Sequence, residues 1–239
     1  MFFVAPLMEL LLIYLAAAVL PAVILLIYVY RQDRTEPEPP DLLLSLVLLG
    51  VAAALLSLLP EALGESVLSA LVQQNSAQYV FLLAFLVVAV VEEGAKFLLL
   101  YRRTWHEPNF NFRFDGIVYA VSVSLGFAAL ENIKYVFTYG LSVAAPRALL
   151  SIPGHMSFAV FMGLFYGRAR LYADRGENGR AKLALFAGWL AAVLLHGVYD
   201  SCAMTGTTES TIFFLVFAAV LYFIVFRLIR KEARSDRPV

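Results

Sequence analysis

Seven apolar stretches run along the chain, and short polar connections separate them. A helix that crosses a bilayer needs about 20 mostly apolar residues. On this rule we expect membrane spans, in order, at Leu7–Tyr30, Leu42–Leu59, Tyr79–Tyr101, Asp115–Phe137, Ala144–Tyr166, Leu183–Met204 and Thr211–Ile229. The pattern therefore predicts an all-α, polytopic helical membrane protein.

The composition agrees with this prediction. Of the 239 residues, 62% are hydrophobic and the mean hydropathy is +0.80, whereas a soluble domain is nearer half apolar. The formal net charge is zero, which gives no reason to expect a nucleic-acid partner. Cys202 is the single cysteine, so an intramolecular disulfide and a cysteine metal cluster are excluded.

The chain is expected to form one integral membrane domain over residues 1–239, with a catalytic core at about 79–204. No basic region precedes the first apolar stretch, so we expect it to be a retained span and not a signal peptide.

Lys and Arg residues predict the orientation of the chain. Of the 18 basic residues, 15 fall in the connections 31–41, 102–114 and 167–182 or near the C-terminus. Cytoplasmic segments carry an excess of Lys and Arg. We therefore expect the N-terminus outside and the C-terminus in the cytoplasm, with the basic connections near anionic lipid headgroups.

The third predicted span contains two adjacent carboxylates and a lysine, Glu92, Glu93 and Lys96. Ionisable groups inside a bilayer are costly, so they mark a functional site unless they only pair with one another. Lys96 lies three and four residues after the two glutamates, within reach of either. One lysine satisfies one glutamate, so the other needs a proton, a metal ion or another donor.

Later spans supply possible partners. They are Glu131, Asn132 and Lys134 in the fourth span, His155 in the fifth, and His196 and Asp200 in the sixth. At about 1.5 Å per helical residue, Glu92, His155, His196 and Glu131 lie roughly 14, 17, 20 and 24 Å from the cytoplasmic ends of their spans. The depths overlap closely enough for one site. Glu131 and Lys134 are also close enough in sequence to pair with each other.

Two local signals concern the backbone. Pro153 lies inside the fifth predicted span, where it is expected to kink the helix and free the carbonyl of Leu149. Asp115, followed by Gly116, has the sequence of a helix N-cap at the start of the fourth span.

Two histidines with a glutamate are a ligand set that leaves zinc one position for water. Zinc lowers the pKa of that water to about 7, and a free carboxylate can serve as its base. The deep acids outnumber the deep bases by two, a difference that a divalent cation or bound protons would balance. No HExxH motif is present. The residues alone thus indicate metal-assisted or carboxylate-assisted hydrolysis.

Four short motifs carry a family resemblance. They are Glu92-Glu93-x-x-Lys96, Phe127-x-x-x-Glu131-Asn132, the single His155, and His196-x-x-x-Asp200, in this order on four spans. Together they resemble the PrsW family of intramembrane proteases, which is related to CAAX prenyl endopeptidases and bacteriocin-immunity membrane proteases. Those relatives typically show EExxxR and FxxxH, so Glu131 stands where they have a histidine.

The resemblance implies an endopeptidase of the bacterial cytoplasmic membrane that cleaves membrane-anchored proteins, with anti-sigma factors as the associated substrate class. We assign Glu131, His155 and His196 as Zn²⁺ ligands and Glu92 as the general base. Glu93 would pair with Lys96 or add a ligand, Asp200 would orient His196, and Lys96 or Asn132 would stabilise the oxyanion.

The sequence is compatible with three alternatives. The first is a metal-free protease in which Glu92 or Glu93 and a histidine activate water. The second is a proton- or ion-coupled transporter, although the sequence has no inverted repeat. The third is a receptor or scaffold in which every buried charge serves packing. The sequence does not define the substrate or the oligomeric state.

Overall fold

The computed structural model of the protein describes residues 4–239, which are almost entirely helical. The elements, in chain order, are α1 (Val4–Tyr30), α2 (Pro40–Leu71), α3 (Ala77–Leu82), the π-helix η1 (Leu83–Ala89), α4 (Val90–Thr104), α5 (Asp115–Tyr139), the 3-10 helix η2 (Leu141–Val143), α6 (Ala144–Leu149), α7 (Ser151–Asp174), α8 (Asn178–Thr205) and α9 (Thr208–Arg234). Residues 4–239 contain one isolated β-bridge, Phe112 with Pro238, and no strand. The all-α prediction is confirmed.

Six helical segments are long and apolar enough to cross a membrane: Met8–Tyr30, Pro40–Leu71, Asp115–Tyr139, Leu141–Asp174, Asn178–Thr205 and Thr208–Arg234. The predicted third span corresponds to α3, η1 and α4, which follow one another without a break. This segment is not among the six, and it carries the charged residues Glu92, Glu93 and Lys96. Large apolar side chains on α1, α2 and α9 are exposed, as expected where helices face lipid. The fold is that of a polytopic helical membrane protein.

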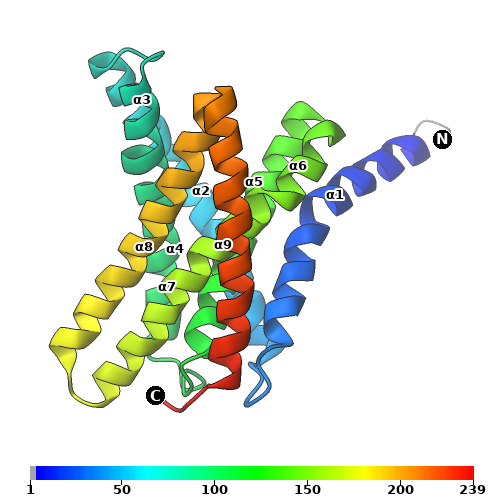
Figure 1. The fold of residues 1–239 in the computed structure, drawn as a ribbon. Coiled ribbons are helices and arrows are strands. Elements are labelled where there is room, and N and C mark those ends of the chain that lie inside the picture. Colours follow the sequence, from blue (N-terminus) through cyan, green and yellow to red (C-terminus); the bar gives the residue numbers. More distant parts are fainter. Residues whose placement is uncertain (1–3) are drawn as a thin grey trace.

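The long helices run side by side, with successive connections at alternate ends (Figure 1). The α1–α2, α4–α5 and α7–α8 connections and the C-terminus lie at one end, the lower end in Figure 1. Asn111 donates to Glu36 there (2.9 Å), and the Arg113 amide donates to the Arg237 carbonyl (3.1 Å). The segments that carry most of the basic residues therefore share one end, which we call the basic end.

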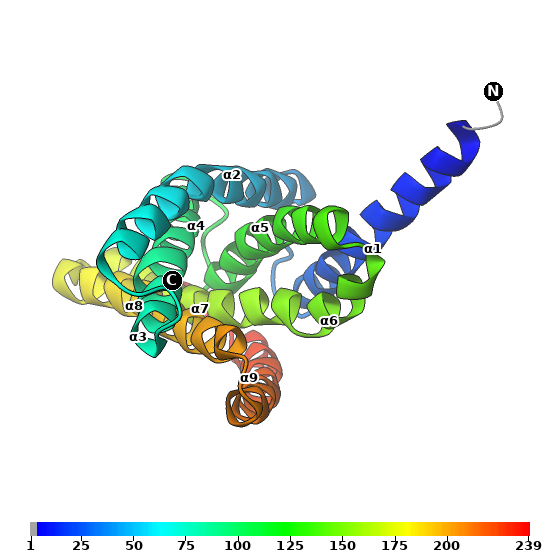
Figure 2. The ribbon, with the colours of Figure 1, turned by 90° about the horizontal axis from the view of Figure 1, so that it is seen from above.

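Helix α5 is the centre of the bundle. Within its apolar stretch 83% of the residues are buried, against 11–61% in the other five membrane-span candidates. Seen from above, α5 lies between α2 on one side and α7 on the other (Figure 2). Residues of α5 are therefore placed to meet side chains from several helices.

Glycines allow α2 and α5 to approach at backbone distance. A Cβ atom added at Gly126 of α5 would overlap the carbonyl oxygen of Val47, and one added at Gly50 of α2 would overlap the carbonyl oxygen of Val123. Without a hydrophobic driving force in lipid, such small residues allow membrane helices to pack closely. This contact fixes the position of Phe127, which follows Gly126 and lines the site described below.

Gly126→Leu is expected to push α2 away from α5, because the overlapping group is backbone and cannot rotate aside. Overpacking of a tight interior costs about 1–3 kcal/mol and occasionally more, and we expect the upper part of this range. Thermal unfolding in detergent would measure the loss. Gly179→Leu is the control, since nothing lies within 4 Å of a Cβ at Gly179; equal unfolding temperatures for the two variants would contradict the packing argument.

The structure corrects three details of the predicted elements. Helix α2 continues to Leu71, twelve residues beyond the predicted end at Leu59, because Pro60 is accommodated within it. The fifth predicted span is divided at Leu150, and α7 begins at Ser151, so Pro153 lies in the first turn of a new helix and does not kink a continuous one. The Leu150 carbonyl accepts from the Gly154 amide and from the Tyr222 hydroxyl of α9 (2.6 Å).

The third correction concerns Asp115. It is the first residue of α5, but Phe114 occupies the N-cap position. Asp115 Oδ2 instead accepts from the backbone amides of Asn111 (3.0 Å) and Phe112 (2.7 Å) in the preceding connection. The predicted N-cap role is wrong, because the carboxylate turns back toward the connection.

Candidate active site

Helix α4 supplies the acidic part of the site. Glu92, Glu93 and Lys96 are exposed by only 5%, 0% and 1%. Lys96 Nζ donates to Glu92 Oε2 (3.1 Å) and to Glu93 Oε1 (2.8 Å). It also lies 3.9 Å from the centre of the Phe127 ring, a cation–π distance. The i, i+3 and i, i+4 spacing thus forms the predicted pairs, and Lys96 pairs with both carboxylates at once.

The π-helix η1 directly precedes α4. Such segments are rare and often occur at functional sites. The Phe85 ring of η1 occupies the space that a side chain at Gly197 of α8 would need. This close contact lies next to His196, so it brings the acidic helix and the helix carrying the second histidine together.

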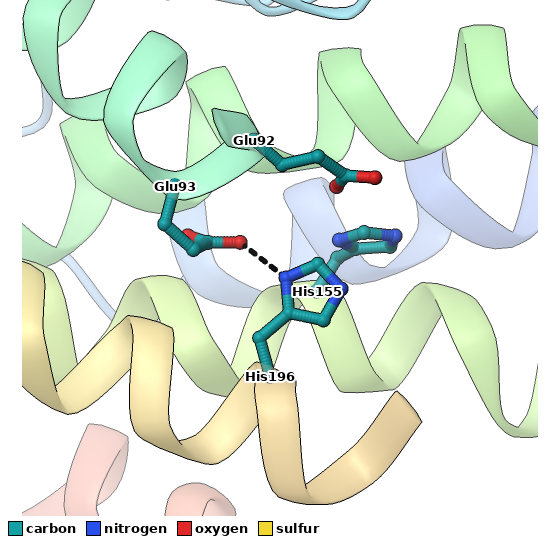
Figure 3. Close-up of side chains that lie close together, drawn as sticks. All are labelled: Glu92, Glu93, His155 and His196. Atoms are coloured by element: carbon teal, nitrogen blue, oxygen red, sulfur yellow. Dashed lines mark hydrogen bonds and ion pairs between the residues drawn. The ribbon is translucent and has the colours of Figure 1, made fainter. Parts of the chain in front are cut away.

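His155 of α7 and His196 of α8 face the α4 carboxylates (Figure 3). Their rings are 5.3 Å apart. His155 Nδ1 lies 3.2 Å from Lys96 Nζ, and His196 Nδ1 lies 2.9 Å from Glu93 Oε1. Both histidines are buried. The predicted meeting of α4, α7 and α8 at one level is present in the structure.

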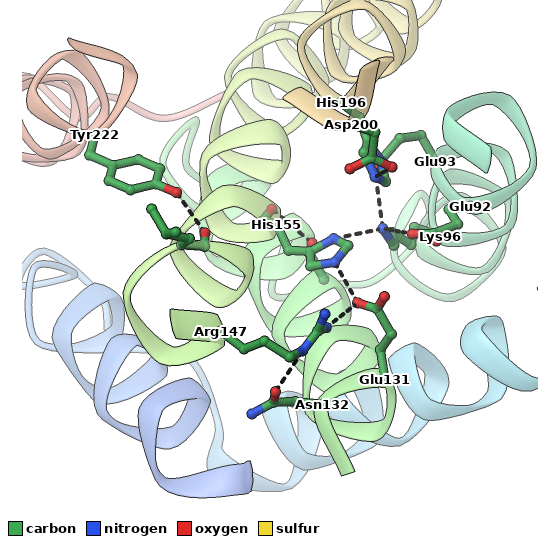
Figure 4. Close-up of polar contacts among 12 residues, drawn as sticks. Glu92, Glu93, Lys96, Glu131, Asn132, Arg147, His155, His196, Asp200 and Tyr222 are labelled. Atoms are coloured by element: carbon green, nitrogen blue, oxygen red, sulfur yellow. Dashed lines mark hydrogen bonds and ion pairs between the residues drawn. The ribbon is translucent and has the colours of Figure 1, made fainter. Parts of the chain in front are cut away.

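Each histidine contacts a further carboxylate through its other nitrogen. Glu131 Oε2 lies 2.9 Å from His155 Nε2, and Asp200 Oδ2 lies 3.2 Å from His196 Nε2. Figure 4 shows Glu131 between His155 and Arg147. A carboxylate on the outer nitrogen of a histidine fixes the orientation of the ring. Asp200 therefore lies where its orienting role was predicted, and Glu131 is placed in the same way.

Arg147 was not identified from the sequence as part of the site. It pairs with Glu131 Oε2 (3.0 Å) and donates to Asn132 Oδ1 (2.8 Å). Asn132 Nδ2 donates to the Ala18 carbonyl of α1 (2.7 Å). Asn132 thus ties α1 and α6 to α5, and its amide does not face the α4 carboxylates. Glu131 pairs with Arg147, and no ion pair joins it to Lys134 among the described side chains.

Four side chains could hold a metal ion. Glu92, Glu93, His155 and His196 each offer a ligand atom, and these atoms lie within 4.8 Å of one another. Carboxylate oxygens and imidazole nitrogens are zinc ligands, and the buried Glu93 Oε2 has no hydrogen-bond partner. The donor types therefore fit zinc. Lys96 Nζ contacts three of these residues, so a bound cation and the ammonium group would compete for them.

A cavity of about 430 Å³ adjoins the cluster. Its polar lining residues are Glu61, Glu92, Glu131, Lys134, Tyr135, Ser151, His155, His196, Tyr199 and Asp200. Most of them lie toward the end of the bundle opposite the basic end, where α5 and α8 finish and α7 begins. Glu61 was not predicted to belong to the site, because it lies beyond the expected end of the second span.

Comparison with known proteins identifies the family. The chain matches "PrsW family intramembrane metalloprotease" over residues 38–229, a range that includes every site residue named above. The chain belongs to the PrsW family. The resemblance inferred from the four motifs is thereby confirmed.

Relatives of the PrsW family match most of the chain. The Protease PrsW of Geobacillus kaustophilus (strain HTA426) is 38% identical over 188 residues, which cover 78% of this chain and 77% of the relative. The Protease PrsW of Bacillus subtilis (strain 168) is 34% identical over 221 residues, 92% of this chain and 95% of the relative. That of Clostridioides difficile (strain 630) is 30% identical over 226 residues, 93% and 92%. No solved structure matches the chain.

Membership of the PrsW family makes this chain an intramembrane protease, a hydrolase with a protein substrate. Its apolar helices make it an integral membrane protein.

Proposed function

We propose that the Glu92, Glu93, His155 and His196 side chains form a zinc-dependent centre that hydrolyses peptide bonds of membrane-anchored proteins. The observation that carries this proposal is the cluster itself: two carboxylates and two imidazoles from three helices, buried and within 4.8 Å of one another. Intramembrane ionisable groups are functional by default, and hydrolysis is the chemistry of the PrsW family.

The distances favour a revised assignment of ligands. His155, His196 and Glu93 would hold the zinc ion, because the Nδ1 atoms of both histidines and Glu93 Oε1 face the cluster. Glu131 and Asp200 would orient the two imidazoles from outside. Arg147 would pair with Glu131 and keep its carboxylate directed at His155. Zinc held there would supply a Lewis acid and a water of low pKa.

Glu92 is the proposed general base. Glu92 lines the cavity. Among the described side chains, its single ion-pair partner is Lys96. The water oxygen would attack the peptide carbonyl carbon while Glu92 accepts the water proton. Glu92 would then pass that proton to the leaving amine as the C–N bond breaks. Lys96 Nζ would donate to the developing oxyanion.

The position of the cavity favours water access from the end opposite the basic end. If the basic end is cytoplasmic, as the Lys and Arg distribution predicts, substrates are cut from the outer half of the bilayer. A single-span substrate of the class implied by the resemblance, the anti-sigma factors, would have to expose the cleaved segment there.

Cleavage of a tagged single-span anti-sigma factor tests the proposal. With protein and substrate reconstituted together in liposomes, we expect a shorter tagged fragment, its loss with a zinc chelator, and its return with added Zn²⁺. Cleavage that persists in zinc-free protein would exclude the metal-dependent mechanism. Absence of cleavage by folded, zinc-loaded protein would argue against this substrate class.

One observation favours a metal-free mechanism as the second candidate. Lys96 Nζ lies among Glu92, Glu93 and His155, where its single positive charge already pairs with both carboxylates. In that case Glu92 and His155 would activate water directly. Membership of the PrsW family favours either protease over the transporter and scaffold hypotheses.

A further inference from the structure

A second cluster of buried acids lies at the basic end of the bundle. Asp33 and Glu38 come from the α1–α2 connection, and Asp115 is the first residue of α5. Their exposed fractions are 5%, 3% and 1%. Each offers a carboxylate oxygen, and these atoms lie within 4.8 Å of one another. Three acidic side chains are thus buried together.

Within the part of the chain that the structure describes, no cationic side chain forms an ion pair with these carboxylates. One oxygen of each, Asp33 Oδ2, Glu38 Oε2 and Asp115 Oδ1, is buried without a hydrogen-bond partner. A buried ionised carboxylate without a partner is strongly unfavourable. A bound cation or bound protons would therefore stabilise these three carboxyl groups.

Tyr119 gives an independent indication of a ligand. It lies one helical turn after Asp115, is 0% exposed, and its hydroxyl lies beside the Glu38 and Asp115 side chains. Nevertheless, this hydroxyl has no hydrogen-bond partner of acceptable geometry among the described residues. Buried tyrosine hydroxyls usually have a partner. Four oxygen-bearing side chains therefore meet around one place, and each has an unpaired oxygen.

We propose that Asp33, Glu38 and Asp115 bind a hard divalent cation, Ca²⁺ or Mg²⁺, with the Tyr119 hydroxyl beside it. Both ions prefer oxygen ligands, at about 2.3–2.6 Å for Ca²⁺ and 2.0–2.1 Å for Mg²⁺. Two ligands of one ion are separated by at most twice that distance, so about 4.6–5.2 Å for Ca²⁺. The upper limit of 4.8 Å on the observed spacing lies within this range for Ca²⁺. Zinc, which favours nitrogen and sulfur, fits this oxygen set less well.

Such an ion would join three parts of the chain. Asp33 and Glu38 belong to the α1–α2 connection, and Asp115 belongs to α5. The C-terminal segment packs beside them, where the Phe114 amide donates to Asp236 Oδ1 (3.0 Å). Asp115 and Glu131 are separated by about 24 Å along α5 at the rise of a helix. The cation site is therefore distinct from the candidate active site, and it does not depend on the proposed function.

Manganese binding tests the proposal, with Mn²⁺ as a spectroscopically visible substitute for Ca²⁺ or Mg²⁺. The full chain would carry His155→Ala with His196→Ala, so that the active-site cluster lacks its imidazoles. After chelator treatment, equilibrium dialysis against MnCl₂ with electron paramagnetic resonance would count bound ions. We expect about one Mn²⁺ per chain, displaced by CaCl₂ or MgCl₂; the more effective competitor identifies the natural ion.

Variants locate the bound ion. Adding Asp33→Asn and Glu38→Gln to this background is expected to weaken Mn²⁺ binding more than about tenfold, since two charged ligands are lost. Asp41→Asn, a neighbouring exposed acid, is the matched control and should bind as before. If the double change prevents folding, Glu38→Gln alone provides the comparison, and CaCl₂ should still raise the unfolding temperature of the parent. The proposal would be overturned if the folded His155→Ala, His196→Ala protein bound no Mn²⁺. It would also be overturned if Mn²⁺ binding were unchanged after the loss of the Asp33 and Glu38 carboxylates.

Discussion

Glu92→Gln is expected to reduce the rate of substrate cleavage by about 10²–10⁴-fold, the usual contribution of a positioned general base. Glutamine keeps the size of the side chain and can still contact Lys96, but it cannot accept a proton from water. Glu93 continues to pair with Lys96, so the fold should persist. Rates would be measured with equal amounts of wild-type and variant protein in liposomes.

Glu65→Gln provides the control for Glu92→Gln. Glu65 is exposed on α2 and makes none of the ion pairs found among the described side chains, so its loss should leave cleavage unchanged. Unaltered cleavage by a folded Glu92→Gln protein would remove Glu92 from the mechanism. Its role as base would then pass to Glu93 or to a histidine.

Lys96→Met is expected to have the largest effect on stability. Lys96 is the one cation that contacts both Glu92 and Glu93 among the described side chains, and all three side chains are buried. Removing one partner of a buried ion pair costs about 3–5 kcal/mol, because a charge is left uncompensated. Methionine fills similar space, so the loss should reflect charge and not a cavity. Unfolding of the reconstituted protein would measure the change in free energy.

Lys134→Met is the comparison for Lys96→Met. Lys134 also lines the cavity, but it is exposed and has no ion pair among the described side chains. We expect Lys134→Met to change the free energy of unfolding of the protein little, since an exposed charge contributes about 0–1 kcal/mol. If both lysine variants unfold alike, Lys96 does not stabilise the α4 carboxylates as described.

The sequence identifies residues whose chemistry is unusual for their surroundings. Glu92, Glu93 and Lys96 stand out because charged groups interrupt an apolar run, and helical spacing alone predicts that they pair. His155, His196 and Asp200 stand out for the same reason. The hydrophobic pattern and the helical period are sufficient to identify these residues. The structure brings them together in one site.

Other parts of the site depend on tertiary contacts that the pattern does not contain. Arg147 lies near the predicted outer edge of a span and reaches Glu131 only because the chain breaks at Leu150 and α6 folds beside α5. Glu61 lies outside the predicted second span, which ends before Pro60, although the apolar residues Ala62 and Leu63 follow. Membrane helices tolerate proline, so the apolar residues after Pro60 are the signal that the helix continues past it.

The second acidic cluster shows the same limit. Asp33 and Glu38 lie about 80 residues before Asp115 in the sequence, and each occupies a polar connection where acids are common. Asp115 has the sequence of an N-cap, so no further role was expected for it. Only the close packing of the α1–α2 connection against the start of α5 reveals that these carboxylates are buried together.

Elemental analysis of purified protein tests the central claim, that the α4, α7 and α8 side chains form a zinc centre. Wild-type protein would be compared with His155→Ala plus His196→Ala, and with His106→Ala, which changes an exposed histidine outside the site. We predict about one zinc per chain in wild type and His106→Ala, and none in the double variant. Folded, active wild-type protein without zinc, or equal zinc in the double variant, would contradict the claim.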